Sequence, residues 1–368
     1  MRILVAPDKF KGCLSAVEAG AYMAAGLRER LPDADIAVVP VADGGEGTAE
    51  VLCRAAGAIW HHCDVAGANG ATVRARYCIT TDNSRAILES SEAVGLWRIP
   101  PEGRDPDAAS SFGVGEMLLD AARRYVSEII VGLGGSGTND GGVGMARALG
   151  FRFLDSFGDE LNGGVSGLLR LVRIVRPSML RLPRITVAAD VRNPLLGRHG
   201  ATQVFATQKG ADAEQREVLE RALARLAEVV SKDLGVDVRH EPGAGAAGGL
   251  GYGLISFCGA RIRSGFDVVA EAVRLAAAID AADIVVTGEG RLDTQTEEGK
   301  APAGVALLAR AAGKPVYAIV GSTRGGEEMF DGVLTLVRPP ITAGEAMKRG
   351  GELLRHRASE LGLLIARS

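Results

Sequence analysis

Five short segments of this sequence place glycines beside acidic, amide and lysine side chains. Glycine N–H groups can surround a phosphate, a lysine can neutralise its charge, and a carboxylate or amide oxygen can hold Mg²⁺ or accept a proton. Phosphoryl transfer needs this combination, and the sequence has neither a histidine–cysteine cluster nor a nucleophile elbow that would favour other chemistry. The segments are "PDKFKG" (7–12), "VADGGEGT" (41–48), "GLGGSGTNDGG" (132–142), "AADVRNPLLGRHGATQVFATQKGA" (188–211) and "TGEGRLDTQTEEGKAPAGVA" (287–306).

The first two segments supply lysines, an acid and glycines close to predicted helix starts. Lys9 and Lys11 follow a buried strand, so one of them could reach a bound anion, although both could equally be solvated. Asp43 follows the next strand, and Gly44 and Gly45 precede a helix whose free N–H groups could bind an anion. Asp43 could hold a metal ion or could only cap that helix.

The third segment is the densest in glycine, and it follows a strongly apolar run. Its backbone N–H groups and hydroxyls could bind phosphate, while an amide and a carboxylate could ligate Mg²⁺. A tight structural turn is the alternative, and the segment is not a Walker loop because no lysine follows the glycines. The phosphate candidates are Gly134, Gly135, Ser136 and Thr138, and the Mg²⁺ candidates are Asn139 and Asp140.

The fourth segment places an acid and an amide directly after a predicted strand. Asp190 and Asn193 could act as a general base or bind Mg²⁺, and Lys209 follows them along the chain. A single aspartate in a turn is more often structural, so the neighbouring amide and lysine carry this interpretation.

The fifth segment joins two glycines and several polar side chains to a helix start. Pro302 suits the first turn of a helix, so the preceding lysine would lie where the helix dipole favours negative charge. A phosphate-binding role is therefore expected for this segment. Its candidates are Gly288, Glu289, Gly290, Arg291, Asp293, Gln295 and Lys300.

Short apolar runs alternate with amphipathic helical patterns, which predicts an α/β fold with a largely parallel sheet. Between residues 62 and 90, apolar and polar residues alternate in place of continuous apolar runs, which predicts half-exposed strands of a different sheet. We therefore expect a Rossmann-like α/β domain formed by residues 1–60 and 265–368, with a second mixed α/β domain, 61–264, inserted into it. The predicted strands are 2–6, 36–41, 128–133, 185–189, 283–288, 316–321 and 333–337, and the predicted helices are 15–31, 46–57, 111–125, 213–233, 266–280 and 302–313.

Composition narrows the class of protein further. The 368 residues carry a formal net charge of −3 without a basic run, which disfavours a nucleic-acid partner. Five cysteines, an odd number without CxxC spacing, fit reduced thiols. The opening strand is unlike a signal peptide, and no 18-residue apolar span occurs, so we expect a cytoplasmic protein without membrane contacts.

Taken in order, these segments resemble the bacterial glycerate kinase family. The matching stretches are "APDKFKGCLSA", "PVADGGEGT", "GLGGSGTNDGG", "ADVRNPL", "QKGA", "PGAGAAGGLG" and "TGEGRLDTQT" with "GKAP". The resemblance implies phosphorylation of D-glycerate by ATP with Mg²⁺, most often at the 2-hydroxyl, by two α/β domains with the active site in the cleft between them. Three departures concern substrate preference: Lys9 stands where Ser is common, "LESSEAVGL" is more polar than usual, and "FATQKGA" replaces "FGPQKGA".

Within that resemblance, the candidate residues receive roles. Asp190 is the leading candidate for the general base, with Asp43 and Asp293 as rivals, and Lys11 and Lys300 are the expected cations for phosphate or for the glycerate carboxylate. Asn139, Asp140 and Asp293 are the expected Mg²⁺ ligands. The expected partners are ATP and D-glycerate, and the expected state is a monomer or homodimer. A 3-phosphoglycerate-forming enzyme, a kinase of another small hydroxy acid and a non-catalytic regulator remain as alternatives.

Overall fold

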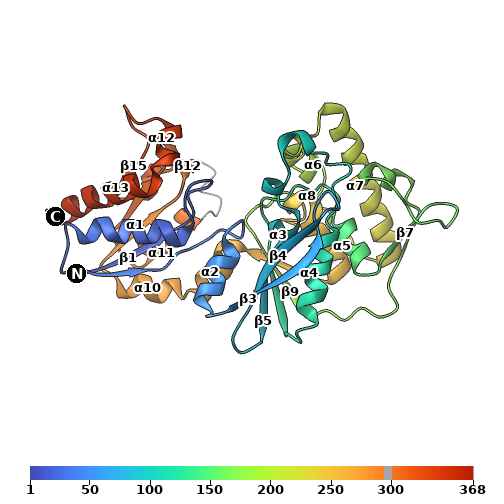
Figure 1. Ribbon diagram of the computed structural model, residues 1–368, viewed down its shortest axis with the longest axis horizontal. Helices are drawn as coiled ribbons and strands as arrows, with labels where there is room; N and C mark the ends of the chain where they lie inside the picture. Colours follow the sequence, from blue (N-terminus) through green and yellow to red (C-terminus); the bar gives the residue numbers. More distant parts are fainter. Residues whose placement is uncertain (294–300, 368) are drawn as a thin grey trace. The chain divides into compact units, whose positions relative to one another are not determined.

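The computed structural model describes residues 1–293 and 301–367, and within it the chain divides into two compact units (Figure 1). The first unit comprises Met1–Asp43, Glu50–Ala55 and Ser264–Ser368, and the second comprises Gly44–Ala49 and Ala56–Arg263. Helix α2 (Thr48–Ala55) begins in the second unit and continues in the first. Each unit is built on one sheet, so the molecule has the predicted α/β class.

The first unit contains a five-stranded sheet in the order β15-β13-β11-β1-β2. All of its strand pairs are parallel, and register pairs such as Val5 with Val286 place the strand ends along one edge. The strands are β1 (Arg2–Pro7), β2 (Asp35–Val38), β11 (Ile284–Gly288), β13 (Val316–Val320) and β15 (Gly332–Thr335). A small parallel pair is formed by β12 (Arg291–Asp293), which follows β11, and β14 (Ser322–Arg324), which follows β13.

Helices cover both faces of this sheet because its strands are buried on both faces. Ile3 and Val5, alternate residues of β1, belong to an apolar cluster with α1 (Ala16–Arg28) and α13 (Gly350–Ile365), which pack side by side in Figure 1. The intervening Leu4 is equally buried, and α10 (Leu275–Ala281) and α11 (Ala301–Ala311) contact the same strand. Two further helices are α9 (Gly265–Ala272) and α12 (Ala343–Lys348).

The second unit contains a mixed sheet of six strands in the order β10-β9-β6-β5-β4-β3. The three central strands β9, β6 and β5 are parallel, whereas β4 pairs antiparallel with both β5 and β3. The parallel part therefore has one carboxyl edge, as in the first unit. The strands are β3 (Ile59–Ala66), β4 (Thr72–Ile79), β5 (Arg85–Glu89), β6 (Glu128–Gly132), β9 (Arg184–Ala189) and β10 (Arg261–Ser264).

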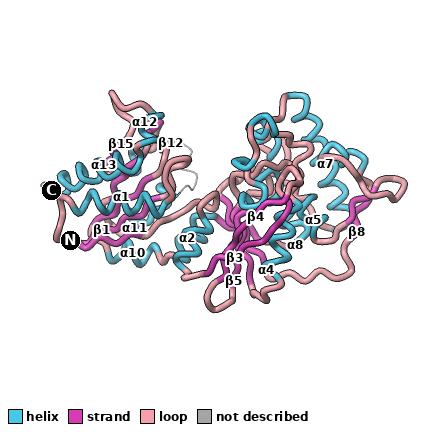
Figure 2. The backbone as a smooth tube through the Cα atoms, in the orientation of Figure 1, coloured by secondary structure: helices cyan, strands magenta, loops and turns pink. Residues whose placement is uncertain are grey.

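Helices of the second unit pack on this sheet and on one another (Figure 2). α4 contacts β3, β6 and α5, and α8 contacts both α5 and β9. A small antiparallel pair, β7 (Arg152–Leu154) with β8 (Arg173–Val175), lies near α7. The helices are α3 (Ser90–Val94), α4 (Phe112–Ala122), α5 (Val143–Ala148), α6 (Ala201–Phe205), α7 (Ala213–Leu234) and α8 (Ala246–Cys258).

Most of the predicted helices and strands are present, but one predicted helix is two helices in the structure. Each of the seven predicted strands has a counterpart, and five of the six predicted helices do. The single helix predicted over 266–280 is wrong: the chain forms α9 and α10, because Arg274 between them has a φ of 53°, which breaks the helical path. The strand predicted over 36–41 ends earlier in the structure, at Val38, but Val39 and Val41 still donate backbone hydrogen bonds to β1.

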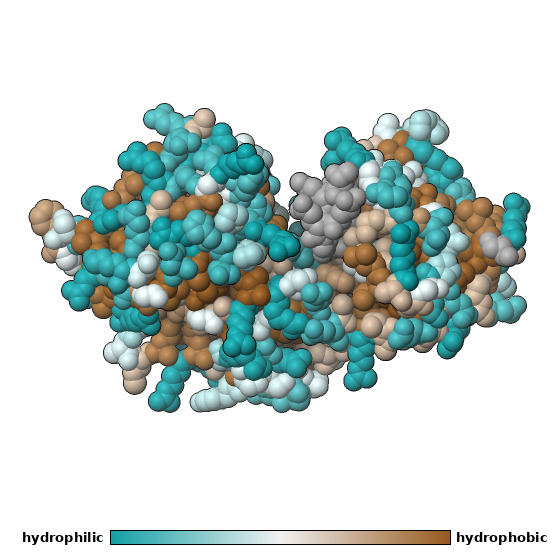
Figure 3. All heavy atoms as spheres, turned by 180° about the vertical axis from the view of Figure 1, so that it is seen from behind, coloured by the Kyte–Doolittle hydropathy of each residue, from teal (hydrophilic) through white to brown (hydrophobic). Residues whose placement is uncertain are grey.

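The face drawn in Figure 3 carries hydrophilic side chains with areas of apolar ones between them. The most exposed apolar residues, Tyr125, Phe157 and Met179, belong to different loops. Among the described residues, none of the helices combines the length and apolar character needed to cross a membrane.

Candidate active site

Acidic residues gather at the carboxyl edge of the sheet in the first unit. Asp8 directly follows β1, and Glu289 directly follows the neighbouring strand β11; both side chains are buried. The Asp8 N–H donates to the carbonyl of Gly288 at 2.8 Å, which joins the two strand ends. Asp43 follows the stretch in which Val41 still pairs with β1. Parallel strands thus bring the three acids to one edge, where ligands of α/β sheets bind.

Lys9 ties two of these acids together. Its Nζ atom lies 3.3 Å from Asp43 Oδ1 and 3.9 Å from Asp8 Oδ1, and its backbone N–H donates to Asp8 Oδ1 at 2.6 Å. The sequence interpretation considered this segment only for its lysines and missed Asp8, although an acid directly after a strand was the available signal. Lys11, the predicted phosphate cation, is exposed two residues further on.

The glycines of the fifth segment are required by close backbone contacts. A Cβ atom on Gly288 would lie 2.1 Å from the carbonyl oxygen of Ile319, and one on Gly290 would lie 3.2 Å from the backbone nitrogen of Lys11. The Gly321 N–H donates to the Glu289 carbonyl at 2.9 Å. The loop after β11 therefore lies tightly between the ends of β13 and the Lys11 turn.

The remaining predictions in the fifth segment concern its last part. Arg291 begins β12 and is exposed. Asp293 ends that strand. Gln295 and Lys300 lie outside the described residues.

A second group of candidate residues lies at the carboxyl edge of the sheet in the second unit. Glu89 ends β5, is buried, and accepts a hydrogen bond of 2.7 Å from the N–H of Ala49 in the first turn of α2. A Cβ atom on Gly134 would lie 2.6 Å from the Cα atom of Gly45, so the "DGGEG" and "GLGGSG" segments touch through bare backbone. Gly44 likewise lies close to Gly132. Sequence reasoning missed Glu89, which lies in the segment noted only for its polarity.

Asp140 holds the glycine-rich segment after β6 in its conformation. Its Oδ2 atom accepts hydrogen bonds from the N–H and hydroxyl of Ser111, both 2.8 Å, and from the N–H of Gly144, 3.0 Å, while Oδ1 accepts from the N–H of Gly142 at 3.0 Å. Four donors match the number of acceptor positions of one carboxylate. Three of the four donors bind Oδ2 and one binds Oδ1, so this carboxylate is used mainly to hold the loop, and its metal role stays a prediction.

Asn139 connects the same loop to the segment after β9. Its Nδ2 atom donates to Thr202 Oγ1 at 3.1 Å, and Thr202 in turn bonds Glu220, which accepts the N–H of Gly197 at 2.6 Å. Burial raises the pKa of Glu220, whereas its hydrogen bonds lower it. Among the described residues, the buried Oδ1 of Asn139 has no hydrogen-bond partner. This amide oxygen is therefore a group that a ligand could satisfy.

Lys209 lies inside the second unit and contacts the loop. Only 2% of its surface is exposed, and its Nζ atom donates to the carbonyl of Thr138 at 2.6 Å, with Ser136 Oγ at 3.5 Å. Burial lowers the pKa of the Lys209 ammonium to about 7, an effect that the nearby Asp140 carboxylate opposes. The buried ammonium thus binds protein backbone, and its predicted substrate contact stays a prediction.

This pKa predicts a pH dependence of stability. An unfolded lysine titrates near 10.5, so between pH 7 and 10.5 the unfolded chain binds more protons than the folded chain. The free energy of unfolding therefore rises with pH in this window, by up to about 1.4 kcal/mol per pH unit, and declines as pH falls toward 7. Lys209→Met removes this contribution, so the melting temperature of the wild type should rise relative to the variant between pH 7 and 9. A pH-independent difference would contradict the shift, and the exposed Lys232→Met provides the control.

Asp190 occupies the end of β9, at the same edge as the glycine-rich loop. Its Oδ1 atom is buried, and the segment that follows it is well anchored. Asn193 donates from Nδ2 to the His199 carbonyl at 2.7 Å and accepts the N–H of Gly245 at its own carbonyl, 2.9 Å. Asn193, the amide of the predicted pair, is therefore held beyond the strand end by hydrogen bonds to and from the backbone.

A second glycine cluster, 243–253, supports the loop after β6. The Gly141 N–H donates to the Gly248 carbonyl at 3.1 Å. A Cβ atom on Gly248 would lie 2.0 Å from the Thr138 carbonyl oxygen, and one on Gly253 would lie 2.7 Å from the Gly141 carbonyl oxygen. Close packing of α8 is thus a sufficient reason for these glycines.

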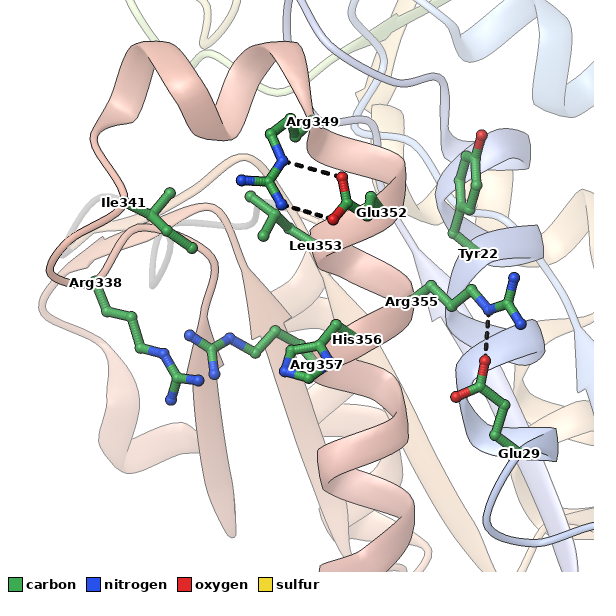
Figure 4. A pocket seen from close by; sticks show the side chains of 10 residues that line it. All are labelled: Tyr22, Glu29, Arg338, Ile341, Arg349, Glu352, Leu353, Arg355, His356 and Arg357. Atoms are coloured by element: carbon green, nitrogen blue, oxygen red, sulfur yellow. Dashed lines mark hydrogen bonds and ion pairs between the residues drawn. The ribbon is translucent and has the colours of Figure 1, made fainter.

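A separate groove in the first unit lies between α13, α1 and the chain near Arg338 (Figure 4). Its volume is about 770 Å³, and its arginines form ion pairs with glutamates, among them Arg349 with Glu352 and Arg355 with Glu29. None of the predicted site residues lines it. Exposed ion pairs of this kind contribute little to stability.

Together the two units form an α/β protein whose parallel strand ends carry glycine loops, acids and lysines, as in enzymes that handle phosphate groups. The pattern of the Glycerate kinase family matches residues 3–366, and the chain belongs to that family. It is 44% identical to the glycerate 2-kinase of Escherichia coli K12 over 88% of this chain and 85% of that protein. It is 40% identical to the glycerate kinase of Halalkalibacterium halodurans over 98% and 97% of the two chains.

A solved structure agrees with this assignment. The crystal structure of a Salmonella typhimurium LT2 protein described as glycerate kinase 2 matches the fold with a TM-score of 0.86 and 42% sequence identity. The match covers 100% of this chain and 98% of that chain. Both the family and the α/β fold predicted from the sequence are therefore confirmed.

Proposed function

We propose that this protein is an ATP-dependent glycerate 2-kinase, which transfers the γ-phosphoryl group of ATP to the 2-hydroxyl of D-glycerate. The observation that carries the proposal is that the predicted segments after β1, β6, β9 and β11 lie at parallel carboxyl edges, in a chain that belongs to the glycerate kinase family along nearly its whole length. The relative from Escherichia coli is named a glycerate 2-kinase, which supports transfer to the 2-hydroxyl and not to the 3-hydroxyl in this protein.

The residue roles follow from what each group can do. The glycerate hydroxyl oxygen attacks the γ-phosphorus, the bond from that phosphorus to ADP breaks, and Asp190 accepts the hydroxyl proton. The backbone of Gly134 and Gly135, which reaches the surface, binds phosphate oxygens with the help of the Gly44–Gly45 turn. Lys11 and Lys300 neutralise phosphate or carboxylate charge.

We further propose that ATP is bound with Mg²⁺, which would neutralise charge on the phosphates. Among the described residues, no group of three or more histidines, cysteines or acids is arranged to hold a metal ion. Mg²⁺ that is carried by nucleotide phosphates needs only one or two protein ligands. The partnerless amide oxygen of Asn139 fits that need. We place this enzyme in the cytoplasm, as a monomer or homodimer acting on small molecules.

The test is to identify the product by ³¹P and ¹³C NMR after incubation with ATP, Mg²⁺ and D-glycerate. We expect glycerate-dependent consumption of ATP and 2-phosphoglycerate as the first product. Accumulation of 3-phosphoglycerate would revise the position of transfer. Turnover only with another small hydroxy acid would revise the substrate, and no turnover with any of them would favour a non-catalytic protein.

Lys11 and Lys300 provide a second test of the proposed roles. Replacing either lysine with methionine should lower kcat/KM at least tenfold, about 1.4 kcal/mol of transition-state stabilisation, because each ammonium acts as a point charge on an anion. The control is Lys232→Met, which removes an exposed ammonium on α7. If both variants melt normally and keep wild-type kinetics, these lysines are solvated side chains without a role in the site.

A further inference from the structure

Two buried charges of opposite sign hold the glycine-rich loop after β6 from inside the second unit. The loop runs from residue 133 to 144, and its Gly134 and Gly135 reach the surface while Ser136 to Asp140 are buried. Lys209 donates to the Thr138 carbonyl, and Asp140 accepts from the N–H groups of Gly142 and Gly144 at the end of the loop and from Ser111 outside it. Each charge is therefore used on the main chain.

Lys209 is itself fixed to the protein framework. Gly210, which follows it, has a φ of 105°, and a Cβ atom there would lie 2.6 Å from the Arg104 carbonyl oxygen. The Nη1 atom of Arg104 donates to the carbonyl of Gln208 at 3.2 Å. The residues before and after Lys209 are thus both held by contacts with Arg104. The 2.6 Å hydrogen bond from Lys209 to the Thr138 carbonyl therefore joins the loop to a fixed part of the chain.

Burying a lysine is costly, so the hydrogen bonds that Lys209 makes inside the second unit must offset that cost. When Lys209 is protonated, its bond to the Thr138 carbonyl has a charged donor, and such bonds are about twice as strong as those between neutral groups. Asp140 supplies the compensating negative charge nearby. A loop that is already ordered before a ligand binds lowers the entropic cost of binding that ligand. Holding the loop after β6 in place would therefore favour phosphate binding.

We infer that Lys209 is a positioning residue, which with Asp140 sets the backbone of Gly134 and Gly135 for phosphate binding without itself touching the nucleotide. The inference rests on the proposed function. It revises the sequence-based roles of Lys209 as a substrate ligand and of Asp140 as a metal ligand.

Hydrogen–deuterium exchange of the ligand-free protein tests this inference without depending on activity. In Lys209→Met, amides in peptides covering 133–145 should exchange at least tenfold faster than in the wild type, while α1 should exchange at an unchanged rate. The same variant should lose at least tenfold in kcat/KM for ATP. A residue that contacts only the nucleotide would lower kcat/KM without changing exchange in the ligand-free protein.

The matched control is Lys232→Met, because the Lys232 Nζ atom also donates to a backbone carbonyl, that of Val172, but is largely exposed. Its exchange and kinetics should stay within twofold of the wild type. If Lys209→Met does not fold, Asp140→Asn tests the opposite anchor and should also loosen 133–145. Wild-type exchange in the folded variant, with or without a kinetic defect, would overturn the inference. A wild type without glycerate kinase activity would refute only the proposed function.

Discussion

Replacing Asp190 with asparagine is expected to lower kcat by about 10²–10⁴-fold while leaving the affinity for ATP nearly unchanged. The substitution keeps the shape of the side chain and removes its ability to accept a proton. Asp190 directly follows β9, at the edge where the loop after β6 begins. Asp43, the rival in the first unit, is engaged by the Lys9 ammonium at 3.3 Å. Asp190, which is followed in its segment by the amide of Asn193, stays our leading candidate for the base.

The measurement is steady-state kinetics together with nucleotide binding, for Asp190→Asn, Asp43→Asn and Asp293→Asn in parallel. Asp237→Asn, which alters an aspartate paired with Arg239 on the surface, controls for a general loss of charge. A kcat within threefold of the wild type would remove Asp190 from the role of base. Loss of ATP binding in the presence of Mg²⁺ would instead identify it as a metal ligand.

The sequence predicted the secondary structure and the α/β class well because both depend on local patterns. Buried parallel strands appear as continuous apolar runs, and all seven were found. The break at Arg274 was missed because nothing in residues 266–280 interrupts the helical period, and the sequence contains neither glycine nor proline where the chain becomes left-handed. Helix α13 was missed, although its pattern contains leucines that pack on α1. The strand orders depend on long-range pairing, which periodicity does not reveal.

The sequence predicted the candidate site as a set of separate segments. The structure adds the contacts and hydrogen bonds between those segments. Glycines were correctly expected at close approaches, but the sequence does not show that Gly134 meets Gly45 or that Gly248 meets Thr138. Lys209 has the residue type of a phosphate ligand, and only its burial reveals that it binds the loop itself. The catalytic, binding and metal assignments, and the domain boundaries, stay predictions.

Substituting Gly248 with alanine is expected to destabilise the second unit far more than the same change at Gly235. Both glycines have left-handed backbones, with φ of 71° and 69°, so both variants carry the conformational cost of about 1–2 kcal/mol for alanine in that region. At Gly235 no described atom lies within 4 Å of the added methyl group. At Gly248 the methyl group would lie 2.0 Å from the Thr138 carbonyl oxygen, the acceptor of the Lys209 hydrogen bond.

The comparison separates backbone strain from collision. Because the atom that obstructs a methyl group at Gly248 belongs to the main chain, the loop or α8 must move to remove the collision. We expect the free energy of unfolding to fall by about 3–5 kcal/mol, the range of severe packing defects. Thermal melting should show a decrease for Gly248→Ala at least twice that for Gly235→Ala, and only Gly248→Ala should also lower kcat/KM in the folded protein. Equal decreases in the two variants would mean that the contact between 248 and 138 yields easily, and that the loop after β6 is not held by the close packing of α8.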